Sequence, residues 1–144
     1  MTSVVYIHVR YSDSDKMGVA HHGAAIRWFE VGRVELMRAS GVSYRDVEET
    51  GFAFPVLEVR ARYRKPARFG DRLKLETSYE TVTKTRVRFA YHLANEEGET
   101  VARGTTEHAC LDRDRRPCRI PPDMLERMDA ALQDRCACTA VEAH

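Results

Sequence analysis

The sequence lacks any long apolar run and any excess of one charge. No stretch approaches the roughly 18 consecutive apolar residues of a transmembrane helix, and the start, MTSVVYIHVR, lacks the basic-then-apolar pattern of a signal peptide. The 23 Lys and Arg residues nearly balance the 22 Asp and Glu residues, for a net charge of +1, so no global field would collect nucleic acid or anionic membrane. We therefore expect a cytoplasmic protein with no nucleic-acid partner and no membrane insertion.

Cysteine is also scarce, and several catalytic signatures are missing. The four cysteines include a C-x-C at Cys136 and Cys138 instead of the paired C-x-x-C of a zinc ribbon. A zinc site made of these two residues and His144 would lack a fourth ligand, so we expect reduced thiols and no metal. The sequence contains no Gly-rich phosphate loop, no G-x-S-x-G and no H-E-x-x-H. These are the usual signatures of nucleotide hydrolases, serine hydrolases and zincins, so none of these classes is indicated.

The length fits one domain. A chain of 144 residues and 16.5 kDa leaves little room for a second folded core, and at this size the core alone stabilises the fold. We expect a single domain over residues 1–132. Residues 133–144 form a polar tail that we expect to be frayed.

Period-two alternation of apolar and charged residues is the strongest local pattern. Leu57, Val59, Ala61 and Tyr63, for example, oppose charged neighbours, which is typical of a half-buried strand. In the first strand Val5, Ile7, Val9 and Tyr11 share the apolar face. Five strands are predicted, at about residues 5–11, 57–64, 72–80, 86–93 and 99–111.

One long helix is predicted between the first two strands. The segment 22–40 has helix formers and no proline, and Gly41 follows where a left-handed C-cap residue belongs. A glycine at position 32 inside this helix indicates close contact with strands, and the small residues Ala102, Gly104 and Thr106 indicate the same from the fifth strand. Shorter helices are predicted at 43–49 and 122–132. The order predicts an α+β fold in which one antiparallel five-stranded sheet wraps around the long central helix.

The loop before this helix carries the most unusual chemistry. Residues 11–22 read YSDSDKMGVAHH and place acids, hydroxyls and two histidines directly before a buried helix. An acid beside the N–H groups of a helix N-terminus can attack or deprotonate while those N–H groups polarise a carbonyl oxygen. The structural alternative is that Asp13, Ser14 or Asp15 only caps a turn.

These residues resemble a known family. The run Tyr11-x-x-x-Asp15-x-x-Gly18-Val19-x-x-His22, then Trp28-Phe29-Glu30, Arg33 and Glu35, is similar to the hot-dog-fold acyl-CoA thioesterases of the 4-hydroxybenzoyl-CoA thioesterase type. The resemblance is closest to the bacterial short-chain acyl-CoA thioesterase branch and covers about residues 5–128. Phe54-Pro55-Val56 and Tyr63-x-x-Pro66-Ala67-x-x-Gly70-Asp71 extend it into the sheet. It implies a hot-dog fold, homodimers with active sites at the subunit interface, and often homotetramers.

The resemblance also implies roles for individual residues. Asp15 falls on the family's catalytic carboxylate, and the backbone N–H of His22 falls on the donor that binds the thioester oxygen. Tyr11 and the His22 side chain would orient the substrate. Where many relatives carry a tyrosine this chain has Ala25, which would enlarge the acyl pocket.

Substrate contacts are implied at two further places. Gly18 and Val19 belong to the loop motif and would bind substrate, while Lys84 and Arg86, at the start of the fourth strand, would contact the phosphates of coenzyme A. No cofactor is expected, because coenzyme A is part of the substrate.

The expected function is hydrolysis of a short or medium acyl or aroyl thioester to free acid and CoA, with Asp15 as nucleophile or general base and the helix N-terminus as oxyanion hole. Dehydration of a hydroxyacyl thioester would need a His with a carboxylate across the pocket, and the acid in the D-x-x-G loop disfavours it. A non-catalytic acyl-CoA-binding hot-dog module is the alternative from another class. Such a module gains nothing from a carboxylate beside a thioester.

Overall fold

The computed structural model describes residues 1–143 of the chain. The elements are, in chain order, β1 (Thr2–His8), the 3-10 turn η1 (Tyr11–Asp13), α1 (His22–Ala39), α2 (Tyr44–Thr50), β2 (Val56–Tyr63), β3 (Arg72–Val82), β4 (Arg86–Ala94), β5 (Thr100–Ala109), α3 (Pro122–Gln133) and β6 (Cys138–Glu142). The five predicted strands and three predicted helices are all present, which confirms the order read from the alternation.

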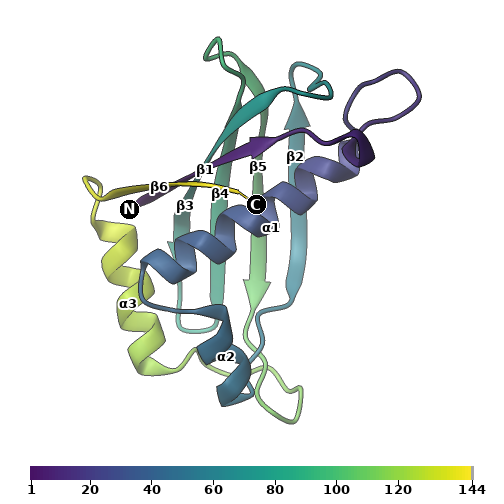
Figure 1. Cartoon of the computed structure of the whole chain (residues 1–144). Helices are drawn as coiled ribbons and strands as arrows, with labels where there is room; N and C mark the ends of the chain where they lie inside the picture. The colour runs from purple at the N-terminus through teal and green to yellow at the C-terminus, as the bar shows by residue number, and fades with distance from the viewer. Residues whose placement is uncertain (144) are drawn as a thin grey trace.

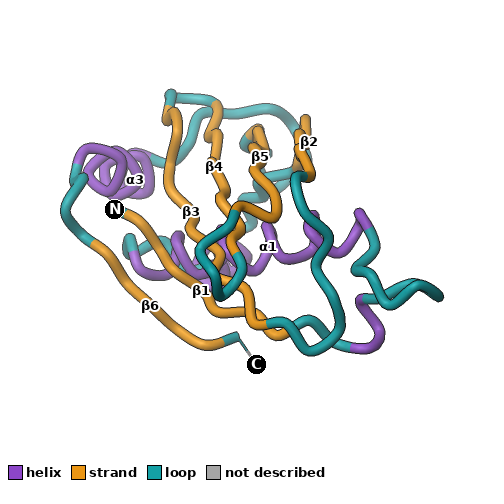
Figure 2. Tube along the Cα trace, turned by 90° about the horizontal axis from the view of Figure 1, so that it is seen from above, coloured by secondary structure: helices purple, strands orange, loops and turns teal. Residues whose placement is uncertain are grey.

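The strands form one sheet in the order β2-β5-β4-β3-β1-β6. Strands β1 to β5 pair only antiparallel to one another, and the sheet curls over α1 (Figures 1 and 2). The predicted α+β class is confirmed, with the sheet wrapped around the long central helix.

The sheet has one strand more than predicted, and its pairing is not wholly antiparallel. Residues 138–142 pair with β1 in parallel register, so the prediction of a frayed tail from residue 133 is wrong over this stretch. Without β6, the outer edge of β1 would leave a row of N–H and C=O groups unpaired. Thr139 and Val141 alternate with exposed neighbours, a pattern too short to stand out in a polar tail.

Small residues let α1 approach the sheet, as predicted. A methyl group on Gly32 would collide with the Thr77 side chain and lie 2.8 Å from Leu75 Cδ2. On β5, a methyl group on Gly104 would lie 2.5 Å from the ring of Phe29, a completely buried residue of α1. The helix and the sheet therefore contact each other at separations that larger side chains would prevent.

Two sets of predicted core residues are exposed instead. On β2, Leu57 is 49% exposed and Val59 37% exposed, because β2 is an edge strand and nothing within residues 1–143 covers these side chains. Tyr11 is 81% exposed, because β1 ends at His8 and the chain then turns through η1, which breaks the alternation. The prediction of a half-buried β2 is therefore wrong for the single chain.

Candidate active site

The loop between β1 and α1 holds the predicted carboxylate. This loop closes on itself through hydrogen bonds from Asp15 N to Val19 O (2.8 Å) and from Gly18 N to Asp15 O (3.0 Å), and Gly18 supplies the required positive φ of 75°. The Asp15 side chain is exposed, and its Oδ1 accepts hydrogen bonds from the N–H groups of Met17 (2.8 Å) and Val19 (3.3 Å). Its Oδ2 makes no hydrogen bond to any residue that the structure describes, so one carboxylate oxygen is left for chemistry.

The neighbouring acid, Asp13, has a structural role. Its side chain is fully buried and forms an ion pair with Arg27 of α1, while its Oδ2 accepts the backbone N–H of Arg10 (2.8 Å). The Asp13 carbonyl accepts the N–H of His21 (2.8 Å). Asp13 therefore links the loop to the start of α1 and caps η1. The structural alternative named above, in which an acid of this loop caps a turn, thus applies to Asp13. Its role between loop and helix was not predicted.

The start of α1 presents free backbone donors. His21 is the N-cap residue and His22 the first helical residue. The N–H of Ala24 donates to His21 O (2.9 Å), whereas the N–H groups of His22 and Gly23 have no acceptor among residues 1–143. An N-terminal turn with free donors is an anion-binding feature, and it lies where the thioester oxygen was predicted to bind.

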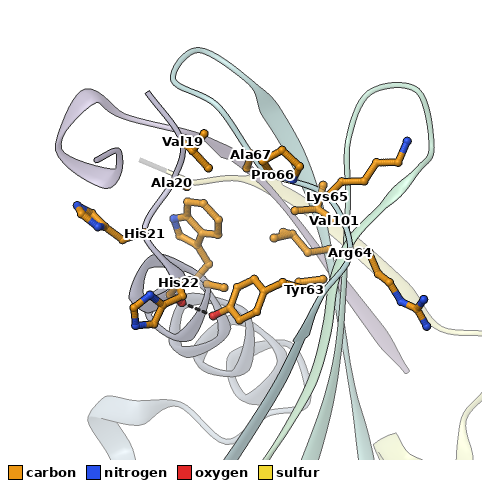
Figure 3. Close-up of a pocket in the computed structure, with 14 residues that line it drawn as sticks. Val19, Ala20, His21, His22, Tyr63, Arg64, Lys65, Pro66, Ala67 and Val101 are labelled. Carbon is orange, nitrogen blue, oxygen red and sulfur yellow. Dashed lines mark hydrogen bonds between the residues drawn. The ribbon is translucent and has the colours of Figure 1, made fainter. Parts of the chain in front are cut away.

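A cavity of about 300 Å³ lies between the start of α1 and the sheet. Figure 3 shows Val19, Ala20, Pro66 and Ala67 along one side of it and the Tyr63 ring reaching toward His22. The other lining residues are His21, Ala25, Trp28, Arg64, Lys65, Leu93, Val101 and Ala102. The wall is mostly apolar, because the Arg64 and Lys65 side chains point away from the cavity (Figure 3).

The structure brings only some of the predicted residues to this cavity. Val19 and His22 line it, but Asp15, Gly18 and Tyr11 do not. Asp15 reaches the wall through its hydrogen bond with Val19. The exposed Tyr11 ring instead packs edge-on against Phe69, with 5.9 Å between ring centroids.

The predicted phosphate contacts lie at the other end of the sheet. Arg86 begins β4, and Leu93, which lines the cavity, follows seven residues later on the same strand, roughly 24 Å away. Lys84 lies in the turn before β4, where its carbonyl accepts the N–H of Ile120 (2.8 Å), and Arg86 faces Glu107 at 3.5 Å. Within one chain, neither cation reaches the mouth of the cavity.

Tyr63 is a site residue that we did not predict. Its hydroxyl donates to the carbonyl oxygen of His22, which links the end of β2 to the first turn of α1 (Figure 3). Burial raises the pKa of this hydroxyl, so it remains a donor at neutral pH. The Tyr63-x-x-Pro66 motif pointed to this segment, although no local pattern indicated a contact with residue 22.

A second polar cluster is buried deeper in the sheet. His108 is 1% exposed, with Nδ1 3.0 Å from Phe54 O and Nε2 2.9 Å from Thr106 Oγ1, and Thr106 in turn bonds Tyr91. Burial lowers the pKa of His108 from 6.5 to about 4, so the ring is neutral at pH 7.

Among residues 1–143 no group of three or more His, Cys, Asp or Glu side chains could hold a metal ion, and His144, named above as a zinc ligand, lies outside the described residues. The cysteines in that part of the chain are all free.

The fold and the cavity at the helix start together define a hot-dog protein of the thioesterase kind. The family model described as the thioesterase-like superfamily matches residues 9–128. The chain belongs to this superfamily and is a thioester hydrolase.

Individual relatives agree with this membership. The chain is 33% identical over 108 residues to YneP of Bacillus subtilis, a candidate acyl-CoA thioesterase. This match covers 75% of this chain and 78% of YneP. It is 31% identical over 119 residues to the 1,4-dihydroxy-2-naphthoyl-CoA hydrolase of Thermosynechococcus vestitus, covering 81% of each. The crystal structure of a DHNA-CoA thioesterase from Staphylococcus aureus superposes with a TM-score of 0.88 at 32% identity, over 97% of this chain and 98% of that one. None of the helices that the structure describes combines the length and hydropathy needed to cross a bilayer.

Proposed function

We propose that the chain hydrolyses a thioester of coenzyme A with a short or medium acyl or aroyl group, releasing the free acid and CoA, at the cavity below the start of α1. The observation that carries this proposal is a free carboxylate oxygen on Asp15, in the loop that leads directly into the unused N–H groups of a helix of 18 residues. Val19 connects the two features, since it binds Asp15 and lines the cavity. Donors aimed at a developing oxyanion lower the barrier to acyl transfer.

Two routes fit this arrangement. In the first, the Asp15 carboxylate attacks the thioester carbon, the carbon–sulfur bond breaks with CoA thiolate as leaving group, and water opens the resulting anhydride to the acid. In the second, Asp15 takes a proton from the attacking water, and that proton passes to the leaving sulfur. Both routes need an ionised Asp15 and the N–H of His22 as oxyanion donor. Tyr11, Gly18 and the His22 side chain contribute to holding the substrate.

We further propose that the working unit is a homodimer paired through β2, and that two such dimers form a homotetramer. The unpaired edge strand β2 exposes Val56, Leu57 and Val59, and Ile26 of α1 is also 42% exposed. Such an apolar edge needs a partner to cover it. A second copy would supply this partner through antiparallel β2 pairing and would cover the Asp15 loop.

This pairing also gives the distant cations a role. Val56 of β2 and Arg86 of β4 pair with neighbouring residues at the same end of β5. Antiparallel pairing of two β2 strands would therefore place Lys84 and Arg86 of the partner subunit near the Tyr63 end, where the cavity opens. There they could contact the phosphates of coenzyme A.

The test is a panel of acyl-CoA thioesters incubated with the protein, with free thiol measured by a chromogenic reagent. Thiol release supports hydrolysis, whereas binding of CoA esters without thiol release would favour the alternative, a non-catalytic acyl-CoA-binding module. Asp15→Asn should remove turnover and preserve the fold measured by circular dichroism. Asp114→Asn, in an exposed loop far along the chain, is the matched control, and near wild-type turnover of Asp15→Asn would remove Asp15 from the mechanism.

A further inference from the structure

Two of the four cysteines lie against each other where β5 leads into the turn before α3 (Figure 1). The sulfur atoms of Cys110 and Cys118 are 3.5 Å apart, and both thiols are free. We propose that this pair is an oxidation site at which a peroxide converts the two thiols to a disulfide, and that this disulfide stabilises the turn between β5 and α3. Ala102, which lines the cavity of the candidate active site, precedes Cys110 by roughly 27 Å along the strand, so the oxidation site is separate from the thioesterase reaction.

The backbone places the two cysteines directly opposite each other. Leu111 and Pro117 form an antiparallel bridge, and the next pair in the same register is Cys110 with Cys118. The N–H of Cys118 donates to the carbonyl oxygen of Cys110 (2.9 Å). Antiparallel partners have Cα atoms about 4.5–5.5 Å apart, which lies within the span of about 4.4–6.8 Å that a disulfide bridges. The two sulfur atoms can therefore form a bond through movement of the side chains alone.

The two thiols differ in their access to solvent. Cys110 is 1% exposed, whereas Cys118 is half-buried. Burial and the adjacent Cys118 thiol raise the pKa of Cys110 to about 12, so Cys110 is protonated at neutral pH and reacts poorly with reagents in solution. An oxidant that arrives from solvent therefore reacts with Cys118 first.

The oxidation consists of two balanced steps. In the first, the Cys118 sulfur attacks one oxygen of hydrogen peroxide, the O–O bond breaks, and the other oxygen leaves as water with the thiol proton, which makes Cys118 a sulfenic acid. In the second, the Cys110 sulfur attacks the Cys118 sulfur, the S–O bond breaks, and the Cys110 proton leaves with the hydroxyl group as a second water. Contact between the two sulfur atoms favours this second step, because it makes the reaction intramolecular. The two thiols are oxidised by two electrons, and one peroxide is reduced to two waters.

The disulfide would close a ring over residues 110–118, and this segment holds other parts of the chain. Leu111 exchanges two backbone hydrogen bonds with Ala53 (2.8 and 3.0 Å). Arg113 Nε donates to the carbonyl oxygen of Thr50 at the end of α2 (3.0 Å). A crosslink within this segment restricts the unfolded chain, so we expect the oxidised protein to be more stable than the reduced protein.

The test uses a protein that carries Cys136→Ser and Cys138→Ser, because these two exposed thiols would otherwise react. Hydrogen peroxide should remove both remaining thiols, measured after denaturation, and lower the mass by two hydrogen atoms. Proteolysis should then release a peptide in which Cys110 and Cys118 are joined. The Tm should rise by about 5–10 °C, and dithiothreitol should reverse all of these changes.

Single substitutions in the same background are the matched controls. With Cys110→Ala, peroxide should add oxygen to Cys118, with no disulfide within the chain and no rise in Tm. With Cys118→Ala, Cys110 should keep its thiol through the same treatment, because it is buried. An equal rise in Tm in either single variant would show that the crosslink is not the cause.

Other outcomes would overturn the proposal. Retention of both thiols, or oxidation of Cys118 to a sulfinic acid without a disulfide, would show that the pair is only a packing contact. A disulfide that leaves the Tm within about 1 °C of the reduced protein would refute the stabilising role. If the background variant does not fold, peptide mapping of the oxidised wild-type chain decides the result, and a disulfide that joins Cys110 or Cys118 to Cys136 or Cys138 instead would contradict the proposed pairing.

Discussion

The buried carboxylate of Asp13 connects the candidate catalytic loop to the helix that carries the oxyanion donors, and removing it should affect both stability and turnover. Asp13→Ala deletes the acceptor of the Arg10 N–H and the partner of Arg27. It also loosens the segment in which the Asp13 carbonyl receives the N–H of His21 (2.8 Å). Asp15, two residues further on, would lose its defined position relative to the first turn of α1.

The magnitude follows from the exposure of the partners. Loss of a hydrogen bond to a charged group costs about 1.5–3 kcal/mol. The Arg27 side chain is 49% exposed and can be rehydrated, so its ion pair adds at most about 1 kcal/mol. Asp13→Ala should therefore lower the free energy of unfolding by about 3 kcal/mol, or the Tm by about 6–12 °C. Asp13→Asn retains an acceptor oxygen and should lose about half as much.

Thermal unfolding and steady-state kinetics on the same samples measure these effects. We expect kcat to fall by about tenfold or more in both variants, with a smaller change in KM, because misplaced catalytic groups weaken the transition state more than substrate binding. Asp114→Ala, at an exposed loop position, controls for the loss of one acidic residue. An Asp13→Ala protein that melts within about 1 °C of wild type and keeps its kcat would show that this carboxylate neither supports the fold nor positions Asp15.

Three further predictions concern the core and the edge of the sheet. Burial lowers the pKa of His108 from 6.5 to about 4, so as the pH falls the unfolded chain takes up a proton at this residue before the folded chain does. The free energy of unfolding therefore keeps its full value above pH 6.5 and declines as the pH falls toward 4. Urea unfolding should show a loss of about 2 kcal/mol between pH 7 and pH 4.5 that is absent in His108→Gln, and parallel pH profiles would contradict this. Gly104→Ala should lower the free energy of unfolding by about 1–3 kcal/mol, since its methyl group would collide with the Arg60 carbonyl and the Phe29 ring; an unchanged Tm would show that the contact relaxes freely. Val59→Lys should yield monomers in light scattering and lower thioesterase activity, and a dimer of wild-type activity would argue against pairing through β2.

Local sequence pattern was sufficient for most of the architecture. Alternation along β1 to β5 and the stretch of helix formers ending before Gly41 depend on neighbouring residues only, because side-chain direction repeats every two residues in a strand and every 3.6 in a helix. The glycines at 32 and 104 also predicted close contact between the helix and the sheet, since each marks a place where a side chain is excluded. The motif in residues 11–22 predicted the loop and the helix start at which the candidate site lies.

Other features depended on contacts between segments far apart in the chain. Asp13 and Asp15 are two residues apart in the same loop, yet one is buried beside Arg27 and the other is exposed, because only the packing of the loop against α1 distinguishes them. The bond from Tyr63 to His22 joins residues 41 positions apart. The polar stretch 138–142 became a strand because folding placed it beside an unpaired edge of β1. Short-range pattern determines which element a segment can form, whereas burial and pairing depend on the groups that the folded chain brings beside it.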